Sequence, residues 1–273
     1  MAANHTHTRG KRVAGFLGAL VLIPGIAAAS LTVASSTAAA PTVILPALPR
    51  IATPLKVKGP CPENMAHVGH SCVDKYEGSL VEVKTDGSVA AFSPYESPTG
   101  HNVRAVSRKG VVPQAHISMN DAKRACTAAG KRLCKAAEWK TACKGPESKR
   151  YPYGDKRTPG VCVDTNRSSP MERLHNGLRN GKTLNDPAAN QMKNTVEATG
   201  AKQSCTNGFG VHDMVGNVHE WTDDASFRGG YYLDTKLNGE GCDYRTTAHA
   251  PAYYDYSTGF RCCADEGLEL QAD

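Results

Sequence analysis

The sequence predicts a single α+β domain that is irregular, poor in regular secondary structure and rich in disulfide bonds. Its 273 residues, 40% of them hydrophobic and 21% charged, have the composition of a globular protein with one large domain or two small ones. Ten cysteines, an even number, lie between Cys61 and Cys263. Gly, Pro, Asn and Asp are dense from residue 151 to residue 210, which is typical of short strands joined by long polar loops.

The first of two expected helices follows Ser118. This residue is a candidate N-cap with Asp121 three residues later, and Asn120 is an alternative N-cap. Small apolar residues then recur on one helical face. Gly130 is expected to end the helix, because glycine readily adopts the left-handed conformation found at helix C-termini.

The second expected helix covers approximately residues 135–143. Ala136, Trp139 and Cys143 are spaced i, i+3, i+7, which places them on one face. Gly145, followed by a proline, ends the segment.

The N-terminus predicts an export signal. A positively charged start precedes the apolar residues 13–29, where Ala27 and Ala29 form a small-x-small cleavage site, and Ala38–Ala40 offers a second. The alternative is an uncleaved membrane anchor, but the run is at the short limit for spanning and contains Pro24. We therefore assign 1–29 to a signal peptide, 30–58 to an Ala/Ser/Pro-rich linker, 59–267 to the domain and 268–273 to a tail.

An exported chain with an even, high cysteine count is expected to form a disulfide framework in an oxidising compartment. The alternative is a metal cluster, but C-x-x-C pairs at zinc-ligand spacing are absent from the sequence. The expected location is therefore periplasmic, at the cell surface or extracellular. A membrane would be contacted only through an uncleaved signal.

The formal charge of +6 does not indicate a nucleic-acid partner. Much of the excess lies in the N-terminal basic residues, and no basic run has interleaved aromatic residues. A solvated, mildly basic surface explains the charge.

Several sequence motifs, in order, resemble the formylglycine-generating enzyme family, also called the sulfatase-modifying factors. Ser118-Met119-Asn120-Asp121-Ala122 is similar to its "S-W-x-D-A" motif, and Gly259-Phe260-Arg261-Cys262 to its "G-F-R-C". The other matching segments are 72–77, 130–133, 137–139, 151–155, 210–221 and 228–232. The resemblance covers approximately residues 60–265 and implies one irregular α+β domain of the C-type-lectin-like kind.

The oxidases of this family bind one copper ion through two cysteine thiolates and use oxygen to convert a substrate cysteine to formylglycine. Here Asp234 stands at the first thiolate position, and 238–240, near the second, contains no cysteine. Cys242 matches a structural cysteine of the family instead. We therefore expect no copper and a non-oxidase binding or structural module. The alternatives are an active formylglycine-generating oxidase and a different enzyme that uses Asp234, His249 or the nearby tyrosines.

The resemblance also implies a disulfide pairing. Two family bridges carry over as Cys126–Cys262 and Cys143–Cys242. The remaining cysteines then pair as Cys134–Cys263, Cys162–Cys205 and Cys61–Cys72, which leaves no free thiol for catalysis.

A calcium site is the binding feature that the resemblance supports best. In the family a turn wraps Ca²⁺, and the matching residues are Asp213 and Glu220 through carboxylates, with Gly216 and Val218 through backbone carbonyls. Such a mixture of oxygen ligands suits Ca²⁺. The alternative is a cation-free turn with Glu220 in a salt bridge. The family's other calcium site falls near residues 163–164, where the ligands do not match cleanly.

The family's active-site groove falls on a segment rich in tyrosine and histidine. The candidate groove residues are Asp234, Arg245, His249, Tyr253 and Tyr254. Tyrosine combines a flat apolar face with a hydroxyl group, so this surface could bind a peptide, protein or glycan ligand. The alternative is a tyrosine-rich loop that only packs.

Two further histidines, His212 and His219, flank the expected calcium turn. They lie seven residues apart with no third ligand at metal-ligand spacing, so structural roles are favoured over zinc binding. His219 stands where the family usually has tryptophan, and we expect it to pack on that surface.

Overall fold

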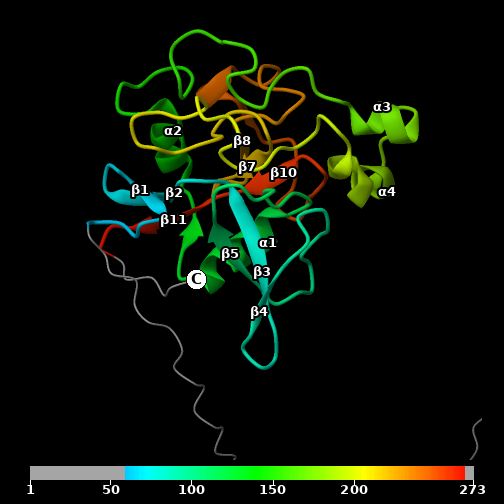
Figure 1. The fold of residues 1–273 in the computed structure, drawn as a ribbon, viewed down its shortest axis with the longest axis horizontal. Coiled ribbons are helices and arrows are strands. Elements are labelled where there is room, and N and C mark those ends of the chain that lie inside the picture. The colour runs from blue at the N-terminus through cyan, green and yellow to red at the C-terminus, as the bar shows by residue number, and fades with distance from the viewer. Residues whose placement is uncertain (1–58, 268–273) are drawn as a thin grey trace, which may run out of the picture. The chain divides into compact units, whose positions relative to one another are not determined.

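Three small β-sheets and two main helices carry the fold in the computed structural model, which describes residues 59–267 (Figure 1). The expected signal peptide, linker and tail lie outside the described residues. The expectation of one irregular α+β domain is confirmed. Within the described part, no helix has the length and apolar character needed to cross a bilayer.

The first sheet brings together the two ends of the domain. Its order is β1-β2-β11-β6 and all its pairs are antiparallel. The strands are β1 (Met65–Val68), β2 (Ser71–Asp74), β11 (Cys262–Asp265) and β6 (Arg132–Leu133).

The second sheet lies under the candidate groove. Its order is β10-β7-β8-β9, in which β10 and β7 are parallel and the other pairs antiparallel. The strands are β10 (Thr258–Phe260), β7 (His219–Trp221), β8 (Phe227–Arg228) and β9 (Arg245–Thr246). The third sheet is antiparallel with order β4-β3-β5, formed by β4 (Val89–Ala91), β3 (Gly78–Val83) and β5 (Val103–Ser107).

Helix α1 (Met119–Ala128) begins and ends as the sequence predicts. The Ser118 side chain accepts a hydrogen bond from the Asp121 backbone N–H at 3.1 Å, and Gly130 has a φ of +69°. The buried face of the helix packs Ala122, Ala125 and Cys126 against apolar side chains of β3, β5, β6 and β10.

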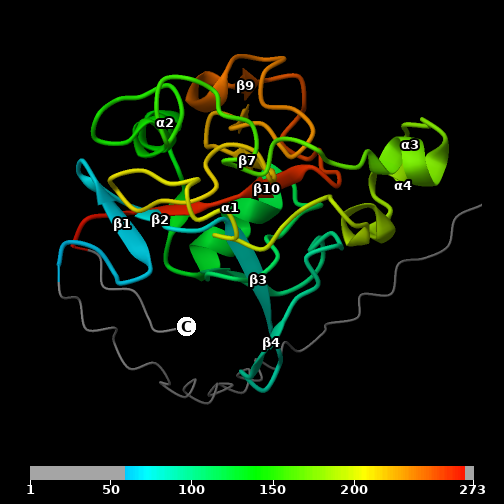
Figure 2. The same ribbon diagram turned by 45° about the horizontal axis from the view of Figure 1, so that its top comes forward.

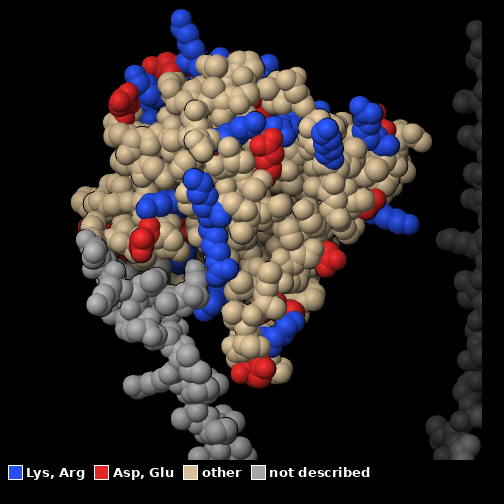
Figure 3. All heavy atoms as spheres, in the orientation of Figure 1, with Lys and Arg blue, Asp and Glu red and all other residues tan. Residues whose placement is uncertain are grey.

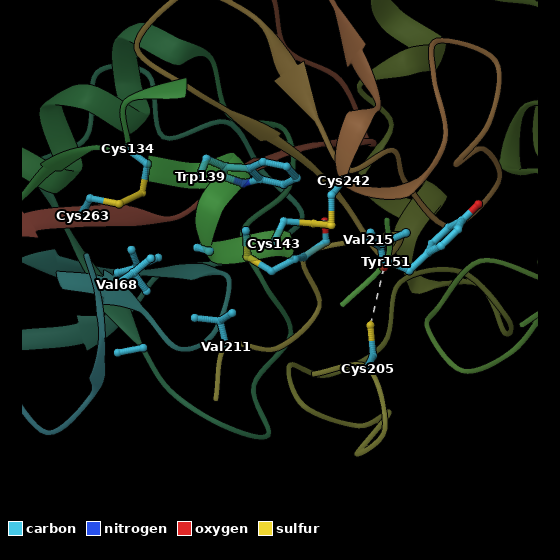
Figure 4. Packing of buried hydrophobic residues seen from close by; sticks show 14 of the residues in the cluster. Val68, Cys134, Trp139, Cys143, Tyr151, Cys205, Val211, Val215, Cys242 and Cys263 are labelled. Carbon is cyan, nitrogen blue, oxygen red and sulfur yellow. Dashed lines mark hydrogen bonds between the residues drawn. A yellow bond between two sulfur atoms is a disulfide. The ribbon is translucent and has the colours of Figure 1, made fainter. Parts of the chain in front are cut away.

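Helix α2 (Ala136–Lys144) is also confirmed. Glu138 accepts from the Lys135 backbone N–H at 2.9 Å, and the helix ends at Gly145 with φ of +70°. Trp139 and Cys143 are fully buried. Figure 4 shows Trp139 between the disulfides Cys134–Cys263 and Cys143–Cys242, so these covalent links are part of the core.

The five disulfides of the structure are the five pairs that the resemblance implies. They join Cys61–Cys72, Cys126–Cys262, Cys134–Cys263, Cys143–Cys242 and Cys162–Cys205. Two of them tie α1 and the β6–α2 connection to β11, across sequence separations of 136 and 129 residues. A single link across a loop of this length restricts the unfolded chain by roughly 5 kcal/mol, but the two loops overlap, so the two contributions do not add.

The expectation of short strands and long polar loops between residues 151 and 210 is wrong in part, because helices lie there and no strand does. Three short helices lie there: α3 (Pro170–His175), α4 (Gly181–Leu184) and the 3₁₀ helix η1 (Pro187–Gln191). We call residues 170–193 the helical lobe, which projects from one side of the three sheets (Figures 1 and 2). The start of α3 has a recognisable signal, since Ser169 caps the Glu172 N–H and Pro170 occupies the first turn. A further 3₁₀ helix, η2 (Gly241–Asp243), precedes β9.

Candidate functional site

The predicted calcium turn has an unusual backbone. Asp213, Gly216 and Asn217 all have positive φ, of 59°, 82° and 55°. A Cβ at Gly216 would lie 2.4 Å from the Val163 carbonyl oxygen, so only glycine allows this close approach. The turn therefore presses directly against the segment that follows Cys162.

Glu220 lies at the end of this turn in a buried ion pair. Its Oε2 accepts from Arg261 Nε at 2.6 Å and from Trp139 Nε1 at 2.6 Å, and its Oε1 accepts from an Arg261 terminal nitrogen at 2.6 Å. Both charged side chains are almost inaccessible to solvent. The structure thus contains the salt bridge that the cation-free alternative invokes, with Arg261 as the partner.

Two further carboxylates face the same region. Glu77, at the end of the 72–77 motif, accepts from Asn217 Nδ2 at 2.7 Å. Asp213 accepts from the Gly200 N–H at 2.6 Å. Burial, together with the neighbouring charges of Asp213 and Glu220, holds the pKa of Glu77 well above its usual range. Burial is also the main reason that the pKa of Asp213 rises to about 6.

The oxygen atoms of the turn fit a cation in part. Neither the Gly216 nor the Val218 carbonyl accepts a hydrogen bond outside the strand ladders, although both residues are buried. A carboxylate can accept about four hydrogen bonds. Glu220 accepts three, so one acceptor position is left. No three His, Cys, Asp or Glu side chains in residues 59–267 are grouped to hold a metal, so carbonyl ligands would be essential. Asp213 and the Gly216 and Val218 carbonyls are oxygen donors of the kind that Ca²⁺ takes, whereas Glu220 is engaged by Arg261 and Trp139.

At the second calcium position of the family, the Asp164 carboxylate is already bonded to protein groups. Asp164 Oδ2 lies 2.8 Å from an Arg157 terminal nitrogen, and its Oδ1 accepts from the Gly160 N–H at 3.0 Å. The Val163 carbonyl accepts from the Asn217 N–H at 2.9 Å. These groups therefore serve to hold the loop.

Asp234, at the first thiolate position, caps a surface loop. Its Oδ1 accepts from the backbone N–H groups of Lys236 and Leu237 at 2.8 and 3.0 Å. Its Oδ2 accepts from the Tyr244 hydroxyl at 2.9 Å. The carboxylate is thus engaged on both oxygens by the loop that it organises.

A continuous aromatic wall crosses the second sheet beside Asp234. The His249 and Tyr253 rings stack with centroids 3.9 Å apart, and His249 lies 5.3 Å from Phe227. His219 stacks on the other side of Phe227 at 5.1 Å and also contacts Tyr231 at 4.8 Å. Burial lowers the pKa of His219 to about 4, so this ring is neutral at physiological pH and packs as expected.

The other two groove candidates lie at the margins of the wall. Arg245 is exposed on β9, 3.4 Å from the Asp224 carboxylate. Tyr254 is half-buried, and its carbonyl accepts from Asn185 Nδ2 in the helical lobe at 3.2 Å. The structure thus brings His249 and Tyr253 into direct contact, places Arg245 on β9 beside Asp224, and joins the Tyr254 backbone to the helical lobe.

All ten cysteines lie within the described residues and all are in disulfides, so residues 59–267 contain no free thiol. Five disulfide bonds are typical of a protein of an oxidising compartment. The site contains two stacked, half-buried rings, His249 and Tyr253, and the exposed guanidinium of Arg245, and residues 59–267 offer no thiolate pair for a soft metal.

Comparison with known proteins agrees with the sequence motifs. The family model of the sulfatase-modifying factor enzyme 1-like domain matches residues 66–266. The formylglycine-generating enzyme of Mus musculus is 32% identical over 161 residues, which cover 55% of this chain and 40% of the mouse protein. The inactive C-alpha-formylglycine-generating enzyme 2 of Bos taurus is 30% identical over 168 residues, covering 57% of this chain and 51% of the bovine protein.

The chain therefore spans about half or less of the length of these relatives. Among solved structures, CarF is similar with 22% sequence identity and a TM-score of 0.34, over 51% of this chain and 49% of CarF.

Proposed function

Because the chain belongs to the family of sulfatase-modifying factor enzyme 1-like domains, we propose that it is an exported member that serves as a binding or structural module and lacks the oxidase reaction. Asp234 carries this proposal. The family's first thiolate position holds a carboxylate that caps its own loop, and the cysteine nearest to it in sequence, Cys242, is bonded to Cys143.

The position of Cys242 explains why it does not replace a catalytic thiol. It lies in η2, is fully buried, and joins the loop to helix α2. Reduction would break a core link beside Trp139. The copper chemistry of the family's oxidases uses two thiolates, which suit Cu(I), and neither Asp234 nor the segment 238–240 supplies one.

The aromatic wall supports a binding role. His249 and Tyr253 present stacked, half-buried rings, and the exposed Arg245 adds a positive charge at the margin. Flat rings with polar edges bind peptide and sugar surfaces at low entropic cost. We propose this wall as the ligand surface, with a peptide, protein or glycan as its ligand.

Calcium is proposed as a structural ion of the turn. Gly216 and Val218 provide two carbonyls without competing hydrogen bonds outside the strand ladders, Asp213 adds a carboxylate that also accepts from the Gly200 N–H, and Glu220 completes the set while it pairs with Arg261. Ca²⁺ would also balance the excess of carboxylates over guanidinium in this region. A cation that binds only the native state at a hundred times its dissociation constant stabilises it by about 2.7 kcal/mol. A chelator should therefore lower the melting temperature, and Glu220→Gln should reduce that effect. A melting temperature indifferent to chelator at neutral pH would show that the turn holds no ion.

The reaction itself is tested directly. The purified oxidised protein is incubated with copper, oxygen and a sulfatase-type peptide that contains cysteine, with the mouse formylglycine-generating enzyme in parallel. Mass spectrometry should find the peptide thiol unchanged with this protein and converted to an aldehyde with the mouse enzyme. Aldehyde formation by this protein would establish the alternative, a formylglycine-generating oxidase.

A further inference from the structure

The helical lobe contains a cavity of about 550 Å³ that none of the groove or turn residues lines. This volume lies within the range of ligand-binding pockets, roughly 300–1,000 Å³. Leu178 and Pro187 give the cavity apolar walls, and Asn180, Lys182, His175 and Asp186 give it polar ones.

The lobe is firmly held by the rest of the domain. Met171 is fully buried in a cluster with Tyr232 and Tyr256. Asn190 Nδ2 donates to the Tyr256 carbonyl at 2.6 Å, and Asn190 Oδ1 accepts from the Tyr232 hydroxyl at 3.1 Å. The cavity is therefore preformed, and a ligand would not have to order it.

Apolar surface is exposed at the cavity and beyond it. Leu178 is 57% exposed and Leu174 is 42% exposed, which places two of the four most exposed large apolar side chains of residues 59–267 in this lobe. Leu174 does not line the cavity, so the apolar surface continues outside it. Exposed apolar side chains at a pocket and next to it favour a segment of a partner protein over a small molecule, because neighbouring exposed apolar residues mark protein-interaction sites.

The charge of the lobe indicates what that segment carries. Residues 170–193 contain four Lys or Arg and two Asp or Glu, a net charge of +2. Asp186 lies 3.1 Å from His175 Nε2, and Glu172 lies 3.7 Å from Arg179. Arg173 and Lys182 have no carboxylate within salt-bridge distance among the described residues. Figure 3 shows Lys and Arg side chains standing out from this lobe.

We propose that the cavity of the helical lobe docks an acidic peptide segment of a partner protein, with an apolar side chain of that segment seated against Leu178 and Pro187. The carboxylates that flank the apolar side chain would lie near Lys182 and Arg173 and be attracted by the positive charge of the lobe. This site goes beyond the aromatic wall proposed above, and it takes a ligand independently of it.

The test uses the whole folded protein and a fluorescein-labelled peptide of sequence Ser-Gly-Glu-Leu-Leu-Glu-Gly-Ser, measured by fluorescence anisotropy. Leu178→Asp should weaken its binding by at least about tenfold, because it places a charge where the apolar side chain sits. Lys182→Glu should weaken it by about fivefold at low salt and by less at high salt.

Matched controls separate this site from others. Leu237→Asp changes a leucine that is 85% exposed outside the lobe, and Val89→Asp changes a valine that is 49% exposed on β4. Both variants should leave peptide binding unchanged. Binding at the helical lobe does not depend on whether the aromatic wall binds a ligand. A peptide with lysines in place of its glutamates should not bind. The proposal is overturned if the acidic peptide does not bind, if Leu178→Asp binds it as well as the unaltered protein, or if the lysine peptide binds equally.

Discussion

Replacing Arg261 probes the buried charges most directly. Its guanidinium donates four hydrogen bonds, two to Glu220, one to the Asp74 carbonyl and one to the His212 carbonyl. The side chain is fully buried. Arg261→Met would leave the Glu220 carboxylate without its cation and two carbonyls without these donors.

The expected loss follows from these contacts. Breaking a buried ion pair by removing one partner costs about 3–5 kcal/mol. The two carbonyls that lose their donors add to this, so the total should be roughly 5 kcal/mol or more. Whole domains are stable by about 5–15 kcal/mol, so Arg261→Met should be largely unfolded or close to it. Arg261→Lys keeps the charge but loses the planar fork, and should lose roughly 3 kcal/mol.

Urea unfolding at neutral pH, followed by tryptophan fluorescence, measures these losses. Arg245→Met is the matched control: its guanidinium is exposed and 3.4 Å from Asp224, so the loss should be about 1 kcal/mol or less. Adding Glu220→Gln to Arg261→Met should restore part of the stability, because it removes the unpaired charge. A loss below about 1 kcal/mol for Arg261→Met would refute the inference that this pair holds the turn and the sheets together.

Three further perturbations test separate parts of the structure. Gly216→Ala should cost more than Gly69→Ala in urea unfolding, since both have positive φ but only the first would place a Cβ 2.4 Å from a carbonyl oxygen; equal losses would contradict this. Burial lowers the pKa of His116 below its usual 6.5, so the folded state resists protonation of this ring. The stability that His116 contributes should be fully present above pH 6.5 and decline as the pH falls below it. His116→Gln should therefore reduce the fall of the melting temperature between pH 6.5 and 5, and an unchanged fall would count against this role. Replacing both Cys134 and Cys263 by serine should lower stability by roughly 3 kcal/mol, because the persisting Cys126–Cys262 link already closes the long loop. The other disulfides should persist in non-reducing peptide maps, and an unaltered melting temperature would mean that this link is redundant.

Helix-capping residues in the sequence correctly predicted where α1 begins and ends and where α2 ends. Ser118 and Gly130 define α1 because a side-chain cap and a left-handed glycine act within a few residues. Two disulfide pairs, Cys126–Cys262 and Cys143–Cys242, followed from family positions, which encode distant contacts that spacing alone does not, and the other three were assigned to the cysteines that remained. The α3 cap at Ser169 was present in the sequence as well, but the abundance of Gly, Asn and Pro around it favoured a loop.

The contacts of the site were harder to predict from the sequence, because the residues that meet there are far apart in the chain. Glu220 and Arg261 meet only because β7 and β10 pair in parallel, and Glu77 joins them from the start of the domain. From the sequence, a salt bridge of Glu220 was only an alternative to calcium, and its partner, Arg261, was not predicted. Whether calcium joins this cluster stays a prediction, because carboxylate chemistry favours an ion and an ion pair alike.

Copper binding tests the central claim most directly. The purified, oxidised protein is titrated with Cu(I) in competition with a chromophoric Cu(I) chelator, with the mouse formylglycine-generating enzyme as the positive control. Because Asp234 replaces the first thiolate and every cysteine of residues 59–267 is in a disulfide, the protein should remove no Cu(I) from the chelator. Uptake of one equivalent of Cu(I) by the fully oxidised protein would contradict the proposal that the oxidase site has been lost.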